Sequence, residues 1–159
     1  MQNKKWFESG RSMIEMVGVL AIMGLLTGGA FVLIKSGLVS QKISRVSDEI
    51  DILASSVGTM MAQSDSFSGL PTTIDKGQNL AKMILKSDGV SPFGGNYYVI
   101  YKASAGTNNK CKKVLTIGIN NMTNASDCTE MKKRSYLGAN FCEAVCNTKT
   151  LEIYYTKTK

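Results

Sequence analysis

The residues of this chain that could do chemistry are few, and histidine is not among them. Without histidine, Ser-His or Cys-His catalysis and histidine-based metal sites are excluded. No two carboxylates stand at a spacing typical of a general acid and base pair. What remains is four cysteines, one acid inside an apolar segment, and two basic clusters. We therefore expect no enzyme activity, no metal and no cofactor.

The four cysteines all lie in the last third of the chain, at Cys111, Cys128, Cys142 and Cys146. In an oxidising compartment, four cysteines predict two disulfides, with three alternative pairings. A zinc site is the rival interpretation, but only Cys142 and Cys146 have the short spacing that zinc ligands need. If these two share a helical face, bridges outward to Cys111 and Cys128 are favoured over a bond between them. The connectivity stays open.

Positive charge is concentrated in the same region. The whole chain has 19 Lys and Arg against 12 Asp and Glu, a net charge of +7. Basic side chains gather in two clusters, Lys110, Lys112 and Lys113, and Lys132, Lys133 and Arg134. Such runs are most often solvated turn residues. The alternative is a surface that holds DNA or another anionic surface through its phosphates, although no nucleic-acid-binding motif accompanies it.

An apolar segment decides the class of the protein. Between Met13 and Ile34, 16 of 22 residues are apolar, and no charge interrupts the last 19. A bilayer-spanning helix needs about 20 such residues, whereas the apolar region of a signal peptide has only about 7 to 15. Basic residues precede the segment, so the positive-inside rule places the N-terminus in the cytoplasm. We predict a single-pass inner-membrane anchor.

Glu15 lies three residues into this segment. A carboxylate in hydrocarbon costs several kcal/mol unless it reaches the interface or finds a partner. One interpretation places Glu15 at headgroup depth, where it has no further role. The other requires a positive group supplied by a second chain.

The run Ser9-Gly10-Arg11-Ser12-Met13-Ile14-Glu15-Met16-Val17 resembles the prepilin cleavage motif of type IV pilins and type II secretion pseudopilins. That motif combines a short basic leader, a glycine at the junction, a glutamate five residues on and a long apolar helix. The resemblance covers residues 4 to about 53. Arg11 departs from the pattern, because the family usually has Phe or Met at this position.

The resemblance implies how such a chain is processed and assembled. A prepilin peptidase cuts after Gly10, which makes Arg11 the first mature residue, with a free or N-methylated α-amine. In a filament the carboxylate of Glu15 pairs with the α-amine of a neighbouring copy. The implied partners are copies of the chain itself, the peptidase, an inner-membrane assembly platform and, before assembly, membrane lipid. The implied location is the inner membrane, and then an extracellular or periplasmic filament.

The helix is expected to continue beyond the apolar segment. Apolar residues recur at alternating spacings of four and three, namely at Val39, Ile43, Val46, Ile50, Leu53, Val57 and Met60. Two interpretations fit this stripe: a coiled coil, or a helix lying on a sheet of the same chain, which the short run of three heptads favours. One helix from Ser12 to about Gln63 would be roughly 75 Å long.

The remainder is predicted to be a small head. A loop from Ser64 to Pro71 precedes a short helix at Asn79–Lys86, and three runs typical of strands follow: Tyr97–Lys102, Val114–Asn120 and Leu151–Thr156. The predicted fold is α+β, with a long N-terminal helix on a small antiparallel sheet and a disulfide-tied C-terminal region. The predicted divisions are a leader (1–10), a transmembrane and polymerisation helix (11–34), an amphipathic helix (35–63) and a head (64–159).

The resemblance implies a structural subunit that polymerises through its N-terminal helix into a type IV pilus-like filament after cleavage between Gly10 and Arg11. Two alternatives remain open from the residues. One is a type II secretion pseudopilin, and the other is a membrane-anchored periplasmic binding domain that never polymerises.

Overall fold

The computed structural model describes residues 9–133 and 140–157, so residues 1–8 of the predicted leader and Arg134 lie outside the described residues. For residues 9–12 and Val32 it describes the backbone alone. The chain divides into two compact units, residues 1–41 and residues 42–159.

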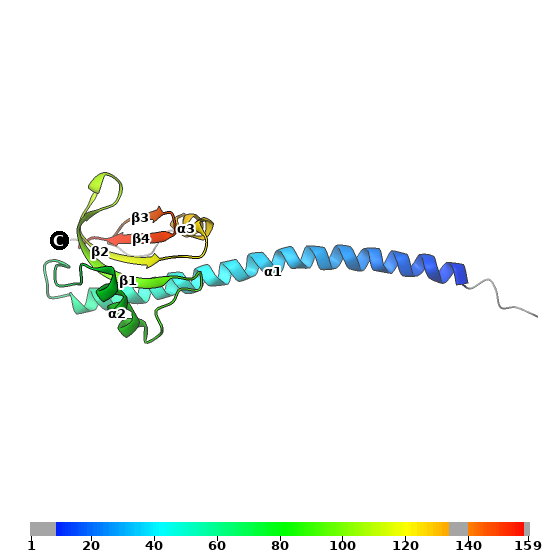
Figure 1. Ribbon diagram of the computed structural model, residues 1–159, viewed down its shortest axis with the longest axis horizontal. Helices are drawn as coiled ribbons and strands as arrows, with labels where there is room; N and C mark the ends of the chain where they lie inside the picture. Colours follow the sequence, from blue (N-terminus) through cyan, green and yellow to red (C-terminus); the bar gives the residue numbers. More distant parts are fainter. Residues whose placement is uncertain (1–8, 134–139, 158–159) are drawn as a thin grey trace, which may run out of the picture. The chain divides into compact units, whose positions relative to one another are not determined.

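One helix, α1 (Ser9–Met60), begins in the first unit and ends in the second (Figure 1). Every side chain that the structure describes between residues 13 and 41 is exposed in the single chain. In the described part of the chain, α1 is the one helix long and apolar enough to cross a membrane. An apolar surface of this length needs a cover that its own unit does not supply.

The second part of α1 buries the predicted apolar stripe. Its buried members are Ile43, Val46, Ile50, Leu53 and Val57, which belong to the same core cluster as side chains of the sheet. The stripe therefore packs on a sheet of the same chain, as the favoured interpretation predicted. The predicted stripe is too long at both ends, because Val39 and Met60 are exposed.

The C-terminal end of α1 is tied to the far end of the chain. The Lys157 ammonium donates to the carbonyl oxygens of Met61, at 2.5 Å, and Ser64, just beyond the helix. It also lies 5.8 Å from the ring centroid of Phe67. A cation at this position satisfies carbonyl groups that a helix end leaves without partners.

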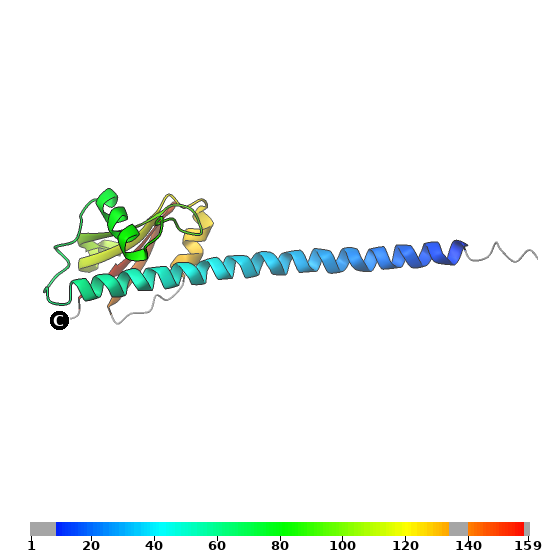
Figure 2. The same cartoon turned by 90° about the horizontal axis from the view of Figure 1, so that it is seen from below.

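The sheet has four antiparallel strands in the order β1-β2-β4-β3. The strands are β1 (Asn96–Ala105), β2 (Cys111–Asn120), β3 (Phe141–Asn147) and β4 (Thr150–Tyr155). Side chains alternate between two faces, as in any strand. The face toward α1, here the inner face, carries the main core, and α1 lies along it within the second unit (Figure 2).

The three predicted strands are confirmed with shifts at their ends, whereas β3 was not predicted. Cys142 and Cys146 therefore lie on a strand, so the premise that they share a helical face is wrong. A register shift between Phe141 and Glu143 disturbs the alternation. As a result, Cys142 packs in a small outer cluster while Cys146 packs against the main core.

Two short helices complete the second unit. Helix α2 (Ile74–Leu85) begins earlier than predicted and packs on β1. The close approach depends on Gly77, where an added Cβ would lie 2.6 Å from Ile100 Cγ2 and 2.7 Å from the carbonyl oxygen of Val99. Helix α3 (Ala125–Lys132), which was not predicted, turns Cys128 and Met131 into the core.

We expect Leu53→Ala to lower the free energy of unfolding of the second unit by about 2–5 kcal/mol, because it removes a fully buried side chain and leaves a cavity. The matched control is Ile52→Ala on the next residue of the same helix, which is 48% exposed and should cost much less. Urea unfolding of the full chain in detergent, followed by circular dichroism, measures both. Equal losses would contradict the helix-on-sheet packing.

Candidate functional site

The predicted processing and assembly residues lie at the start of α1. Gly10 and Arg11 are in its first turns, where the structure describes their backbone only. Glu15 is exposed and stands among exposed apolar side chains, including Met13 and Met16. No side chain that the structure describes forms an ion pair with Glu15. The carboxylate is thus presented on an apolar surface without a described partner.

The four cysteines form two disulfides, Cys111–Cys142 and Cys128–Cys146. The prediction of two bridges is confirmed, and so is the preference for outward bonds from Cys142 and Cys146, although its helical premise was wrong. Both bonds start on the edge strand β3. One bond reaches the start of β2 and the other reaches α3. Among the described residues, no group of three or more potential metal ligands occurs.

One lysine from each basic cluster acts through its charge on the same carboxylate, that of Glu143. Both the hydroxyl and the backbone N–H of Thr107 donate to Glu143, at 2.6 and 2.8 Å, and lower the pKa of its carboxyl. Lys110 from the first cluster and Lys132 from the second lower the pKa of this carboxyl further. The described lysines of both clusters are exposed, and Lys133 also pairs with Glu130 at 2.7 Å. The anion-holding role of these lysines stays a prediction.

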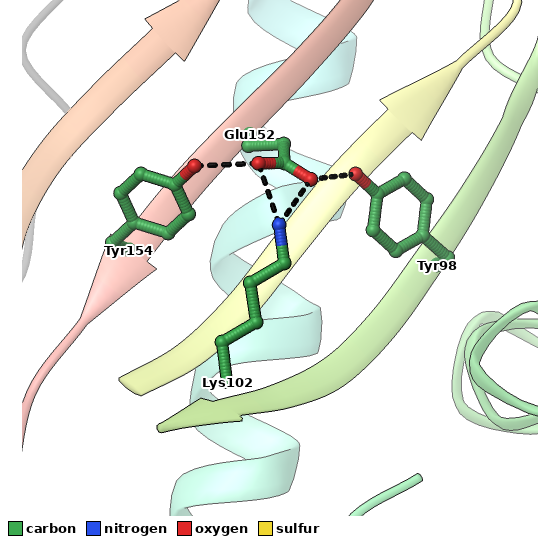
Figure 3. Close-up of polar contacts among 4 residues, drawn as sticks. All are labelled: Tyr98, Lys102, Glu152 and Tyr154. Atoms are coloured by element: carbon green, nitrogen blue, oxygen red, sulfur yellow. Dashed lines mark hydrogen bonds and ion pairs between the residues drawn. The ribbon is translucent and has the colours of Figure 1, made fainter. Parts of the chain in front are cut away.

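The outer face of the sheet carries a polar cluster that sequence reasoning missed. Glu152 accepts hydrogen bonds from Tyr98 at 2.8 Å, from Tyr154 at 2.5 Å and from the Lys102 ammonium at 2.7 and 2.8 Å (Figure 3). Tyr98 and Lys102 lie on β1, whereas Tyr154 and Glu152 itself lie on β4. Strands β1 and β4 are on either side of β2. The carboxylate therefore joins strands that do not pair with each other.

A glycine makes this contact across β2 geometrically feasible. Tyr98, Gly118 and Glu152 are successive partners in one row across β1, β2 and β4. An added Cβ at Gly118 would lie 2.4 Å from Tyr98 Cζ and 2.5 Å from its hydroxyl oxygen. The tyrosine ring thus lies across the glycine and reaches the carboxylate on the far side.

The charges of the cluster follow from burial and hydrogen bonding. Burial alone would raise the pKa of Glu152, but the hydrogen bonds from Lys102, Tyr154 and Tyr98 outweigh it and lower that pKa. Burial first, and the negative charge of Glu152 second, raise the pKa of Tyr98. At neutral pH the cluster is an ionised glutamate and lysine with two neutral tyrosines. All three donor groups, the two tyrosine hydroxyls and the Lys102 ammonium, are directed to one acceptor, which favours a structural role over catalysis.

Comparison of the chain with protein-family models, with curated proteins and with solved structures found no match. The resemblance of residues 9–17 to the prepilin motif therefore stays a prediction.

We expect Glu152→Gln to lower the free energy of unfolding by about 1–3 kcal/mol at neutral pH, because the half-buried Lys102 and the two buried tyrosine donors lose a charged acceptor. The pKa of Glu152 is lowered on folding, so its contribution is present above its unfolded pKa of about 4.3 and is lost as pH falls through the folded pKa. The difference between wild type and variant should therefore shrink in acid.

Urea unfolding of the full chain in detergent at pH 7 and below pH 4 measures this effect. The matched control is Glu130→Gln, because the pair of Glu130 and Lys133 is exposed and should contribute little at either pH. A pH-independent difference for Glu152→Gln would contradict the ionised cluster.

Proposed function

We propose that this chain is a structural subunit that polymerises through the first part of α1 into a filament of the type IV pilus kind, after cleavage between Gly10 and Arg11. The observation that carries the proposal is the exposed apolar segment from residue 13 to residue 34, with one carboxylate near its start. Two kinds of surroundings could cover such a segment, a lipid bilayer or the same segment of other copies.

Glu15 favours copies of the chain over lipid as the final cover. A bilayer offers an isolated carboxylate no positive partner, so retention of the charge there is costly. A bundle of cleaved helices offers one, because each copy would begin with the α-amine of Arg11 close to the same depth. A buried charge with a partner is tolerable, whereas an unpaired one is strongly unfavourable.

The second unit supports the same proposal from another side. Its two disulfides favour an oxidising compartment outside the cytoplasm, which agrees with a helix inserted with its N-terminus inside the cell. Its own core is closed, since α1 residues 43–57 and the inner face of the sheet cover each other. Assembly is therefore assigned to the apolar segment, and the head would face outward. A pilus and a type II secretion pseudopilus share these features.

Processing gives the first test. Gly10→Val should leave an uncut membrane precursor, because a prepilin peptidase needs a minimal side chain before the cut. The matched control is Gly18→Val in the same helix, which should be cut normally. Immunoblotting of membrane fractions and N-terminal sequencing detect the products. Mature protein beginning at Arg11 in normal amount from Gly10→Val would contradict the prepilin assignment.

Assembly gives the second test. Glu15→Ala should insert into the membrane at least as well as wild type, since removal of the charge favours insertion by about 2–3 kcal/mol. It should be cut at Gly10 yet enter filaments poorly, because the α-amine of the neighbour loses its partner. The measurement is filament yield from sheared cells beside membrane abundance, with Met16→Ala as the control that keeps the charge.

The outcomes separate the candidate functions. Wild-type filament yield from Glu15→Ala would exclude the pairing mechanism. Absence of filaments from the wild type under every expression condition would favour the monomeric membrane-anchored domain.

A further inference from the structure

The tip of the β1–β2 hairpin, residues Ser104 to Lys113, is here called the strap. The strap reaches β3, although β3 is separated from β2 by β4 in the sheet. Thr107 donates to Glu143 on β3, and Cys111 is bonded to Cys142 on the same strand. The strap therefore bends over the outer face near the end of β4; in Figure 1 its light-green turn lies beside β3.

A local irregularity in the β1–β2 pairing lies at the base of the strap. The pairing of β1 with β2 passes from Lys102 and Val114 to Ser104 and Lys112, and Lys113 takes a φ of 50°. This left-handed conformation is uncommon for a residue with a side chain. The hairpin thus keeps one register, with an interruption at Ala103 and Lys113 and renewed pairing from Ser104–Lys112 to Ala105–Cys111.

Few contacts hold the strap down. Its apolar contacts form a small cluster separate from the main core, with four buried residues, Ala105, Cys111, Val114 and Tyr154, and two partly buried ones, Cys142 and Val145. Its polar contacts to Glu143 are at the surface. Exposed hydrogen bonds contribute little on their own, so the Cys111–Cys142 bond is the strongest restraint on the strap.

The second disulfide has a different setting. Cys128 is fully buried in the main core, together with Met131 of α3, and Cys146 packs against that core. Loss of the Cys128–Cys146 bond would leave α3 held by these contacts. Loss of the Cys111–Cys142 bond would leave the strap with the small cluster and the surface hydrogen bonds to Glu143.

The strap also touches the polar cluster beneath it. The backbone N–H of Gly106 faces the Tyr154 hydroxyl, which donates to Glu152. An added Cβ at Gly106 would lie 2.5 Å from Glu143 Oε2 and 3.1 Å from Cys111 Sγ, which shows how closely the strap is seated. The closed strap thus packs on Tyr154 and holds Thr107 at hydrogen-bond distance from Glu143.

We propose that the Cys111–Cys142 disulfide is a redox-sensitive latch, whose reduction lifts the strap from the outer face while the rest of the second unit stays folded. A dithiol reductant supplies the two electrons and two protons. Its first thiolate attacks one sulfur of the bond and releases the other as a thiolate, which leaves a mixed disulfide. Its second thiolate then attacks the reductant's own sulfur in that mixed disulfide, releases the remaining protein thiolate and closes the reductant into a cyclic disulfide. Cys111 and Cys142 end as thiols. Lifting the strap exposes Tyr154 and removes the two hydrogen bonds of Thr107 from Glu143, so the latch sets whether this part of the outer face is covered.

Hydrogen exchange of the full chain in detergent tests the latch. In Cys111→Ser/Cys142→Ser, amide exchange in residues 104–113 should accelerate at least tenfold, while residues 96–102 of β1 and 43–57 of α1 keep the wild-type rate. The matched control is Cys128→Ser/Cys146→Ser, in which the strap should keep its wild-type protection. Unchanged strap exchange in the first variant, or equal acceleration in both variants, would overturn the proposal. So would acceleration throughout the sheet.

A second measurement needs no variant. Wild-type chain is reduced stepwise with dithiothreitol, quenched by alkylation and digested for mass spectrometry. Alkylated Cys111 and Cys142 should accumulate before Cys128 and Cys146, with strap exchange rising in step and recovering on reoxidation. Prior reduction of Cys128–Cys146, or reduction of both bonds together with global unfolding, would contradict the latch.

Discussion

The second unit depends on one match between two periodic surfaces. The buried stripe on α1, from Ile43 to Val57, recurs every three or four residues, while the inner-facing side chains of β1, β2 and β4 recur every second residue. Each surface would be exposed without the other. Burial of both provides the main driving force for folding of this unit, and the direction in which β1, β2 and β4 turn their side chains follows from it.

Because α1 occupies the inner face, the outer face has to satisfy its own polar groups. Tyr98 and Glu152 alternate with inner-facing core residues on their strands, and Gly118 leaves room for them to meet. Each oxygen of the Glu152 carboxylate then accepts a hydrogen bond, and the Lys102 ammonium donates to both oxygens. A buried carboxylate is acceptable only when it is paired in this way. The strap packs on Tyr154 at one end of this face.

The sequence predicted those features that depend on local pattern. The stripe of α1, the apolar segment and three of the strands follow from spacing and β-branched or aromatic content. Strand β3 was missed because Phe-Cys-Glu-Ala-Val-Cys-Asn has no clear alternation and two of its residues, Glu and Ala, are uncommon in strands. The Glu152 cluster was missed because Tyr98 and Lys102 lie 54 and 50 residues from Glu152 along the chain, so only the register of the sheet brings them to it.

Glu152 and Glu15 both lie in apolar surroundings, where a carboxylate needs a partner. This one requirement leads to different conclusions for the two residues. Glu152 lies among side chains that donate to it, so this carboxylate has its partners within the second unit. Glu15 stands on an apolar helix with no ion pair to any described side chain, and the apolar residues around it are exposed. A chain that satisfies one buried acid so fully and leaves the other unpaired is consistent with a head that folds alone and a helix that requires other copies. That asymmetry is the physical basis on which we propose a polymerising subunit.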